Sequence, residues 1–375
     1  MTDIQFTRQD TQAVKGLAAL LLIIHHTLGV NPGIPAPLFS AGADFQTVLG
    51  GASKACVAIF LILSGYGMTE KARSAPGFGY RDVFSRLRRL YRVYWIAFAL
   101  LALWQVLRSG FASLSAVYGA PDGEAPLRPL LWLLKDLLGL HDIGYDIGLR
   151  SPTLNAGTWF LGALLLCYLL FPLLLRAFRK GRIPAEAALL AVTFAPWIWY
   201  LAAGDLNMHT DREIFYVFPF CLGMVLSNHG LLHRLKALAL RRRLWMALAS
   251  VAFLMAALVL RQAVCLPADP LLALALLAAM VCLVCVCPEN RVVVRFFRGV
   301  GSLEAWIYYL HPIGLSLLAG ISFYTTGCRV LATCVLCVLL ASGGAAIDRI
   351  LPRRQESAHT RAISGRSPSP SGSDS

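Results

Sequence analysis

The sequence predicts an all-α membrane protein: a polytopic helix bundle with about ten transmembrane helices and both termini in the cytoplasm. Hydrophobic residues make up 57% of the 375 residues and charged residues only 14%, with a mean hydropathy of +0.64. A soluble globular domain is typically about 25% charged. Apolar runs of membrane-spanning length recur along the chain, and positive charge alternates between the loops that join them.

Each run of roughly 17–25 mainly apolar residues predicts one span. The expected spans are 14–30, 54–69, 91–107, 157–176, 187–203, 214–228, 244–260, 270–287, 303–320 and 329–346. The apolar segment Leu127–Leu140 is shorter and is interrupted by Lys135 and Asp136, which favours an interfacial helix over an eleventh span. We expect residues 1–350 to form one membrane domain, and the Ser- and Pro-rich residues 351–375 to form a disordered cytoplasmic tail.

The distribution of basic residues predicts the orientation. The loops on the side of the N-terminus hold 26 of the 34 lysines and arginines. By the positive-inside rule that side is the cytoplasm. The net charge of +14 is spread over every cytoplasmic loop and is not gathered with aromatic residues on one surface, which argues against nucleic-acid binding. No cysteine–histidine spacing typical of a zinc site occurs, so no metal is expected.

The first span carries ionisable residues in helical register. Ionisable groups are costly in a bilayer unless they face protein or water. Lys15 lies at the cytoplasmic end of this span, and His26 follows eleven residues later. Eleven residues return to within about 20° of the same helix face and rise about 16 Å. His25 is rotated about 80° away. The pattern favours His26 as a functional residue, whereas a lone histidine is more often hydrogen-bonded between helices.

The ninth span carries a second polar stripe. Glu304, Tyr308 and His311 are spaced four and three residues apart, which places them on one helix face. Glu304 alone is compatible with a helix cap, and His311 before Pro312 with a helix break. The three together favour a polar lining inside the bundle, which makes Glu304 and His311 candidate catalytic residues.

Two further motifs lie in and after the second span. Ser64, Gly65 and Gly67, in the run FLILSGYGM, lower the bulk of one helix turn, which allows access by a ligand, with close helix packing as the alternative. Arg89 and Arg92, in RLRRLYRVYW, are three residues apart on one face. Such a pair suits phosphate binding, with a cytoplasmic anchor beside an aromatic belt as the alternative.

In their order along the chain, these segments resemble the acyltransferase-3 family of bacterial integral-membrane O-acyltransferases, over about residues 10–350. Lysine stands at position 15, where the family more usually has arginine, and this change removes a bidentate donor. The segments GTWF and GSLEAWIYYLHP also resemble the family's Trp-Phe span and late histidine segment. The other matching positions are Lys15, His26, Phe60, Leu61, Ser64, Gly65, Arg89 and Arg92.

The resemblance implies transfer of an acyl group, by default acetyl, from cytoplasmic acyl-CoA to a hydroxyl of a cell-envelope glycan or lipid-linked acceptor. The expected location is the bacterial inner membrane, in contact with its lipids. Lys15, Arg89 and Arg92 then bind the donor, His26 acts as general base, and Ser64 or a nearby backbone amide supports the oxyanion. The alternatives are a transporter of an envelope precursor or acyl donor, a non-catalytic membrane partner, and an enzyme that carries the acyl group covalently on Ser64 or a histidine.

Overall fold

The computed structural model is all-helical, which confirms the predicted fold class. It describes residues 6–28, 45–75, 77–119, 127–143, 151–178, 183–203, 213–264, 269–286 and 292–351. Helices account for 87% of these residues, and no strand occurs among them. Of the predicted tail, only Leu351 falls within the described residues.

Each predicted span overlaps one helix. These helices are α1 (Arg8–Thr27), α3 (Cys56–Ser74), α4 (Tyr80–Ser109), α7 (Trp159–Phe178), α8 (Ile183–Ala203), α9 (Val217–Asn228), α11 (Leu240–Val264), α12 (Asp269–Val286), α14 (Glu304–Leu318) and α15 (Thr326–Ile350). The connecting helices are α2 (Phe45–Ser53), α5 (Ala112–Tyr118), α6 (Arg128–Leu137), α10 (Leu231–Ala237) and α13 (Val292–Ser302), with 3₁₀ turns η2 (Ala156–Thr158) and η3 (Glu213–Tyr216).

Several of these helices have the length and composition of membrane spans. Among the described residues, four segments qualify: Val48–Ser74, α4, α7 and α15. A fifth is formed if η3–α9 and α10, which meet at a bend of 57°, make one span. The protein is therefore a multi-pass membrane protein, and the count of ten spans stays a prediction.

Local sequence signals set the helix ends. At the start of α1, the Asp10 N–H donates to the Thr7 hydroxyl and the Thr7 N–H donates to the Asp10 carboxylate, which forms a capping box. At the start of α4, the Gly79 N–H donates to Asp82 Oδ2 at 3.2 Å. α4 ends at Gly110, whose φ of +72° favours glycine.

Glycines allow α1 to lie directly against α13. A Cβ on Gly16 would overlap the Phe297 carbonyl, and a Cβ on Gly301 would overlap the Gln12 carbonyl. Small residues in facing positions let helix backbones approach closely in membrane proteins. This contact holds the N-terminal half of α1 in place, and with it Lys15.

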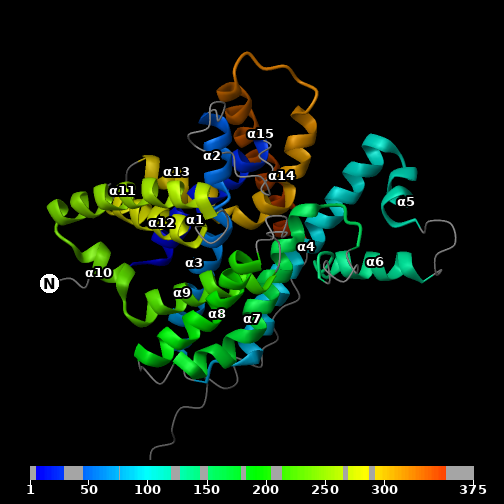
Figure 1. The fold of residues 1–375 in the computed structure, drawn as a ribbon. Coiled ribbons are helices and arrows are strands. Elements are labelled where there is room, and N and C mark those ends of the chain that lie inside the picture. The colour runs from blue at the N-terminus through cyan, green and yellow to red at the C-terminus, as the bar shows by residue number, and fades with distance from the viewer. Residues whose placement is uncertain are drawn as a thin grey trace, which may run out of the picture.

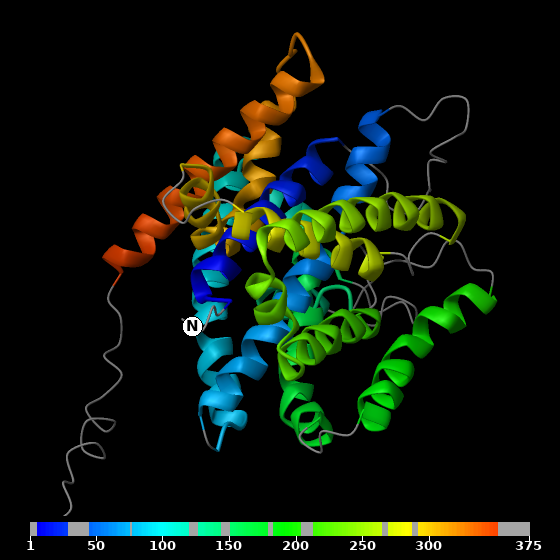
Figure 2. The same cartoon turned by 90° about the vertical axis from the view of Figure 1, so that its left-hand side faces the viewer.

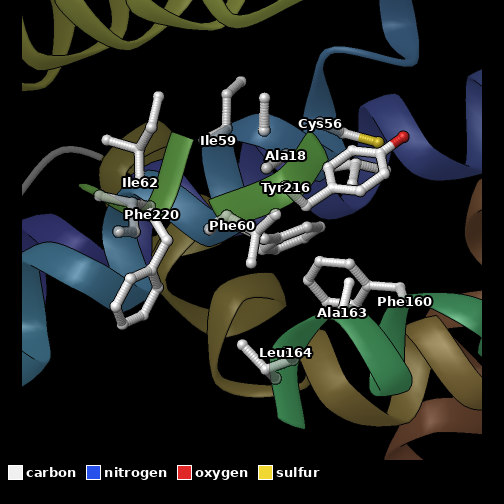
Figure 3. Close-up of a cluster of buried hydrophobic side chains, with 14 of the residues drawn as sticks. Ala18, Cys56, Ile59, Phe60, Ile62, Phe160, Ala163, Leu164, Tyr216 and Phe220 are labelled. Atoms are coloured by element: carbon white, nitrogen blue, oxygen red, sulfur yellow. The ribbon is translucent and has the colours of Figure 1, made fainter. Parts of the chain in front are cut away.

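α3 and α9 meet through a second pair of glycines. A Cβ on Gly65 would overlap the Phe220 carbonyl, and a Cβ on Gly223 would overlap the Ile62 carbonyl. Beside this crossing, Phe60 from α3 and Phe160 from α7 face one another, with ring centroids 6.3 Å apart (Figure 3). In the FLILSGYGM run, Gly65 therefore serves helix packing.

Contacts along the helices show the relative direction of α3 and α9. α3 and α9 run the same way, since Glu70 and Ser227, near their C-terminal ends, are joined by a 2.6 Å hydrogen bond. α14 and α15 form a hairpin whose turn projects from the bundle in two perpendicular views (Figures 1 and 2). α5 and α6 lie to one side of α4, away from the α11–α12 pair (Figure 1).

The segment predicted to be an interfacial helix contains the short helix α6. Five leucines of this segment are exposed, as expected of a helix that meets lipid: Leu127, Leu130, Leu131, Leu134 and Leu138. Asp136 does not follow this pattern, because it is only 1% exposed. The C-terminal end of α6 is thus buried while its apolar face is open.

Candidate functional site

The two polar stripes predicted on separate spans face each other. α1 and α14 lie side by side and run in the same direction. Lys15 pairs with Glu304 towards their N-terminal ends, and His26 meets His311 farther along both helices. Helix periodicity accounts for each stripe, and the packing of α1 on α14 joins the two into one polar track.

The N-terminal end of the track is an ion pair. Lys15 Nζ donates to Glu304 Oε1, and the two side chains are 20% and 26% exposed. Glu304 is the first residue of α14, where the helix dipole favours a carboxylate. Its second oxygen, Oε2, is buried and has no hydrogen-bond partner among the described residues. The pair therefore carries a carboxylate that is only partly satisfied.

The other end of the track is a pair of stacked imidazoles. The rings of His26 and His311 have centroids 4.7 Å apart and planes inclined by 33°. His26 is exposed, whereas His25 is buried and donates from Nδ1 to the Gly50 carbonyl of α2 at 2.7 Å. The His26 ring is therefore accessible, while His25 ties α1 to α2.

Pro312 determines which nitrogen of His311 carries a proton. Proline has no N–H, so the carbonyl four residues earlier, that of Tyr308, loses its helical donor. His311 Nδ1 lies 2.7 Å from this oxygen and donates to it. In neutral imidazole the other nitrogen then bears a lone pair, so His311 Nε2 is an acceptor.

A loop before α7 forms one wall of the site. The Tyr308 hydroxyl donates to the Gly157 carbonyl. A Cβ on Gly157 would lie 3.7 Å from His311 Cε1, so this backbone is directly beside the imidazole. Asn155 Nδ2 donates to the Tyr309 carbonyl at 3.3 Å. The loop thus contacts α14 at Tyr308, Tyr309 and His311.

Ser64 makes no hydrogen bond to the described residues of this track. It is buried on α3, and no hydrogen bond joins it to either histidine within the described residues. The neighbouring Gly65 packs against α9. Within the described residues, no hydrogen bond therefore links Ser64 to the other predicted catalytic residues.

The two arginines predicted to bind phosphate differ in their surroundings. Arg92 Nε donates to Asp348 Oδ1 at 2.5 Å, and its Nη2 donates to the Asp348 and Leu351 carbonyls at 3.2 and 3.1 Å. Arg89 is exposed, and within the described residues it makes no hydrogen bond or ion pair. Arg92 thus caps the end of α15, and Arg89 is available to a ligand.

Sequence reasoning did not single out several buried polar residues. Lys54, at the start of α3, is 4% exposed, and Asn155 is 5% exposed. His141 and Asp142 are adjacent in the chain and lie 3.7 Å apart, from Nε2 to Oδ1. The polar run SPTLNAGT ahead of an apolar span was the available signal for Asn155. Among the described residues no cluster suits a metal ion.

Comparison with known proteins identifies the family. A sequence model of the acyltransferase-3 family, described as an acyltransferase domain, matches residues 10–345. Neither curated proteins nor solved structures gave a match. The family match spans most of the chain and includes both halves of the polar track. The chain therefore belongs to the acyltransferase-3 family and is a multi-pass membrane acyltransferase.

Proposed function

We propose that this protein transfers an acyl group, most simply acetyl, from cytoplasmic acyl-CoA to a hydroxyl of a cell-envelope glycan or lipid-linked acceptor in the bacterial inner membrane. The observation that carries the proposal is the polar track between α1 and α14. One end has a basic residue at a partly open ion pair, and the other has an accessible histidine stacked on a second histidine. An anionic donor and a proton-bearing acceptor need these two kinds of site.

Donor binding uses the N-terminal end of the track. Coenzyme A carries several phosphate charges, and Lys15 and the exposed Arg89 are cations on two different helices. A phosphate that binds Lys15 competes with Glu304 for the same ammonium. Lysine binds phosphate as a point charge, so it releases one anion and accepts another without a fixed geometry. Arg92 instead holds α4 against the end of α15.

Chemistry takes place at the histidine pair. His26 accepts the proton of the acceptor hydroxyl while the oxygen attacks the thioester carbonyl. The tetrahedral intermediate collapses with cleavage of the carbon–sulfur bond, and the proton passes from His26 to the departing thiolate. The products are an ester and free coenzyme A. His311, fixed by Tyr308, supports the His26 ring from one side.

Turnover by purified protein tests this proposal. Protein in detergent is incubated with labelled acetyl-CoA and separate glycan and lipid fractions of the envelope. We expect label in one fraction with wild-type protein and a large loss with His26→Ala. A transporter requires a sealed membrane and gives no labelled product in detergent. Absence of label from every fraction, with acyl-CoA binding intact, would contradict the proposed reaction.

A further inference from the structure

Asp136 is a buried carboxylate that the mechanism above does not use. It is 1% exposed at the C-terminal end of α6, where the helix dipole disfavours a negative charge. Within the described residues no cation pairs with it. Neutral groups satisfy it instead: Thr153 Oγ1 donates to Oδ1 at 2.7 Å, while the Tyr118 hydroxyl and the Leu154 N–H, at 3.0 Å, donate to Oδ2. Burying a carboxylate without a cation costs free energy, so we expect Asp136 to have a function that offsets this cost.

The backbone around Asp136 is attached to α4 independently of its side chain. Three aromatic side chains of α4 donate to three successive carbonyls at the end of α6. Tyr94 donates to the carbonyl of Asp136, Trp95 to that of Leu137 and Tyr91 to that of Leu138, the last two at 2.9 and 2.7 Å. Carbonyls at the end of a helix have no donor within the helix, and that of Asp136 accepts from the Gly139 N–H as well, at 2.8 Å. The carboxylate therefore projects from a fixed point.

From this point hydrogen bonds lead to the site. Thr153 Oγ1, which donates to Asp136, also accepts from the Asn155 N–H at 3.0 Å. Asn155 Oδ1 accepts from the Gly157 N–H at 3.0 Å, and the Asn155 amide donates to α14. Gly157 in turn accepts from Tyr308 and lies beside His311. The path runs continuously from α6 to the histidine pair.

We propose that Asp136 is a positioning residue for the acyl-transfer site: its carboxylate sets the course of residues 153–157, which hold Tyr308 and the backbone against His311. The proposal rests on the function proposed above for this site. Asp136 touches neither substrate nor histidine and acts through the loop.

The geometry requires a carboxylate. Both oxygens accept, and the Leu154 N–H can only donate. Burial, and then the nearby Asp136 charge, raise the pKa of the Tyr118 hydroxyl, so that group stays protonated and donates. Asparagine offers one accepting oxygen and alanine offers none. Asp136→Asn should therefore retain part of the loop geometry, and Asp136→Ala should lose it.

Amide hydrogen exchange and kinetics together test the proposal. The exchange rates compared are those of Leu154, Asn155 and Gly157, whose N–H groups all donate within this network. Asp136→Asn and Asp136→Ala are measured beside Asp82→Asn, a partly exposed carboxylate that caps α4 elsewhere. Thermal unfolding and acetyl-CoA binding are measured for each variant. Thr153→Val provides a second break in the path, with the Asp136 charge retained.

Exchange at Asn155 and Gly157 is the decisive readout, because neither amide touches Asp136. We expect Asp136→Ala and Thr153→Val to speed it about tenfold and to lower kcat by at least about tenfold, since a displacement of about 1 Å can cost up to 10²-fold. Acetyl-CoA binding should change less than about twofold, with Asp136→Asn intermediate and Asp82→Asn like wild type. Faster exchange at Leu154 alone, with kcat unchanged, would overturn the positioning role. If wild-type protein shows no turnover, the proposed function fails, and exchange at Asn155 and Gly157 still decides whether Asp136 sets the loop.

Discussion

The Arg92 guanidinium and the Asp348 carboxylate form a 2.5 Å contact that fastens the end of α15 to α4. The sequence pattern predicts phosphate binding for both Arg89 and Arg92, but only Arg92 has this carboxylate partner. Arg92 also donates to the Asp348 and Leu351 carbonyls, which have no helical partners at the end of α15. Arg89, one turn earlier, is exposed. The two residues should therefore respond differently to the same substitution.

We expect Arg89→Gln to weaken acetyl-CoA binding about tenfold with little change in thermal stability, because it removes a charge available to phosphate. Arg92→Gln should lower the free energy of unfolding by about 1–2 kcal/mol, since its partners are partly screened by solvent. Calorimetric titration and thermal unfolding in detergent measure these effects. Each variant serves as the control for the other. Equal effects on binding would mean that Arg92 also reaches the donor.

Substitution of the two adjacent histidines should have different effects, on catalysis at His26 and on stability at His25. His26→Ala removes the accessible imidazole and should lower kcat about 10²–10⁴-fold, with donor binding nearly unchanged. His25→Ala removes the bond to the Gly50 carbonyl and should mainly lower the unfolding temperature, since it loosens α2 from α1. Single-turnover kinetics and thermal unfolding distinguish the two. A greater catalytic loss at His25 would show that the catalytic assignment is wrong.

Substitution of the two members of the Lys15–Glu304 pair should change the affinity for acetyl-CoA in opposite directions. Glu304→Gln frees the Lys15 ammonium and should tighten acetyl-CoA binding about 3- to 10-fold at low salt. Lys15→Ala should weaken binding by a similar factor, and both effects should shrink as ionic strength rises. Glu70→Gln removes a carboxylate that pairs with Arg73 and serves as the matched control. Unchanged affinity after Glu304→Gln would mean that the pair is structural only.

Glycines of one helix, α3, provide a test of the packing. Gly65→Ala places a methyl group on the Phe220 carbonyl and should cost about 1–3 kcal/mol of stability. Gly67→Ala meets nothing within 4 Å and should be neutral or stabilising by up to about 1 kcal/mol, through helix propensity. Thermal unfolding of the two variants measures the difference. Similar unfolding temperatures would argue against close contact between α3 and α9.

Cys328 tests the predicted topology. Of the described cysteines it alone is exposed, at the start of α15. With the other cysteines replaced, a membrane-impermeant maleimide should label Cys328 in spheroplasts whose inner membrane is intact. In a cysteine-free background, Ser74→Cys at the end of α3 should react only after permeabilisation. The reverse pattern would place both termini outside the cytoplasm.

The sequence predicted each half of the candidate site but not how the halves meet. Lys15 and His26 share one face of a helix, as do Glu304, Tyr308 and His311, because helical periodicity acts within a single segment. The ion pair and the ring contact depend on how α1 packs on α14, which periodicity does not specify. The partner of Arg92 lies at the far end of the chain and was hidden for the same reason.

Irregular segments were the least predictable part. Asn155 and Gly157 lie in a loop whose contacts come from hydrogen bonds without a repeating spacing. Asp136 was visible as an interruption in an apolar run, but its burial depends on groups from α4, α5 and the loop. Ser64 was compatible with two roles, and the contacts of its neighbour Gly65 show packing at that turn.

A polar track that extends through a membrane protein is also a route by which ions could leak. An acyltransferase whose track was open to ions from one side of the membrane to the other would dissipate the proton gradient of the cell. The Lys15–Glu304 pair places a fixed positive and a fixed negative charge across one end of this route. We therefore expect the pair that competes with the donor for Lys15 also to oppose the entry of ions at this end of the track in the resting protein.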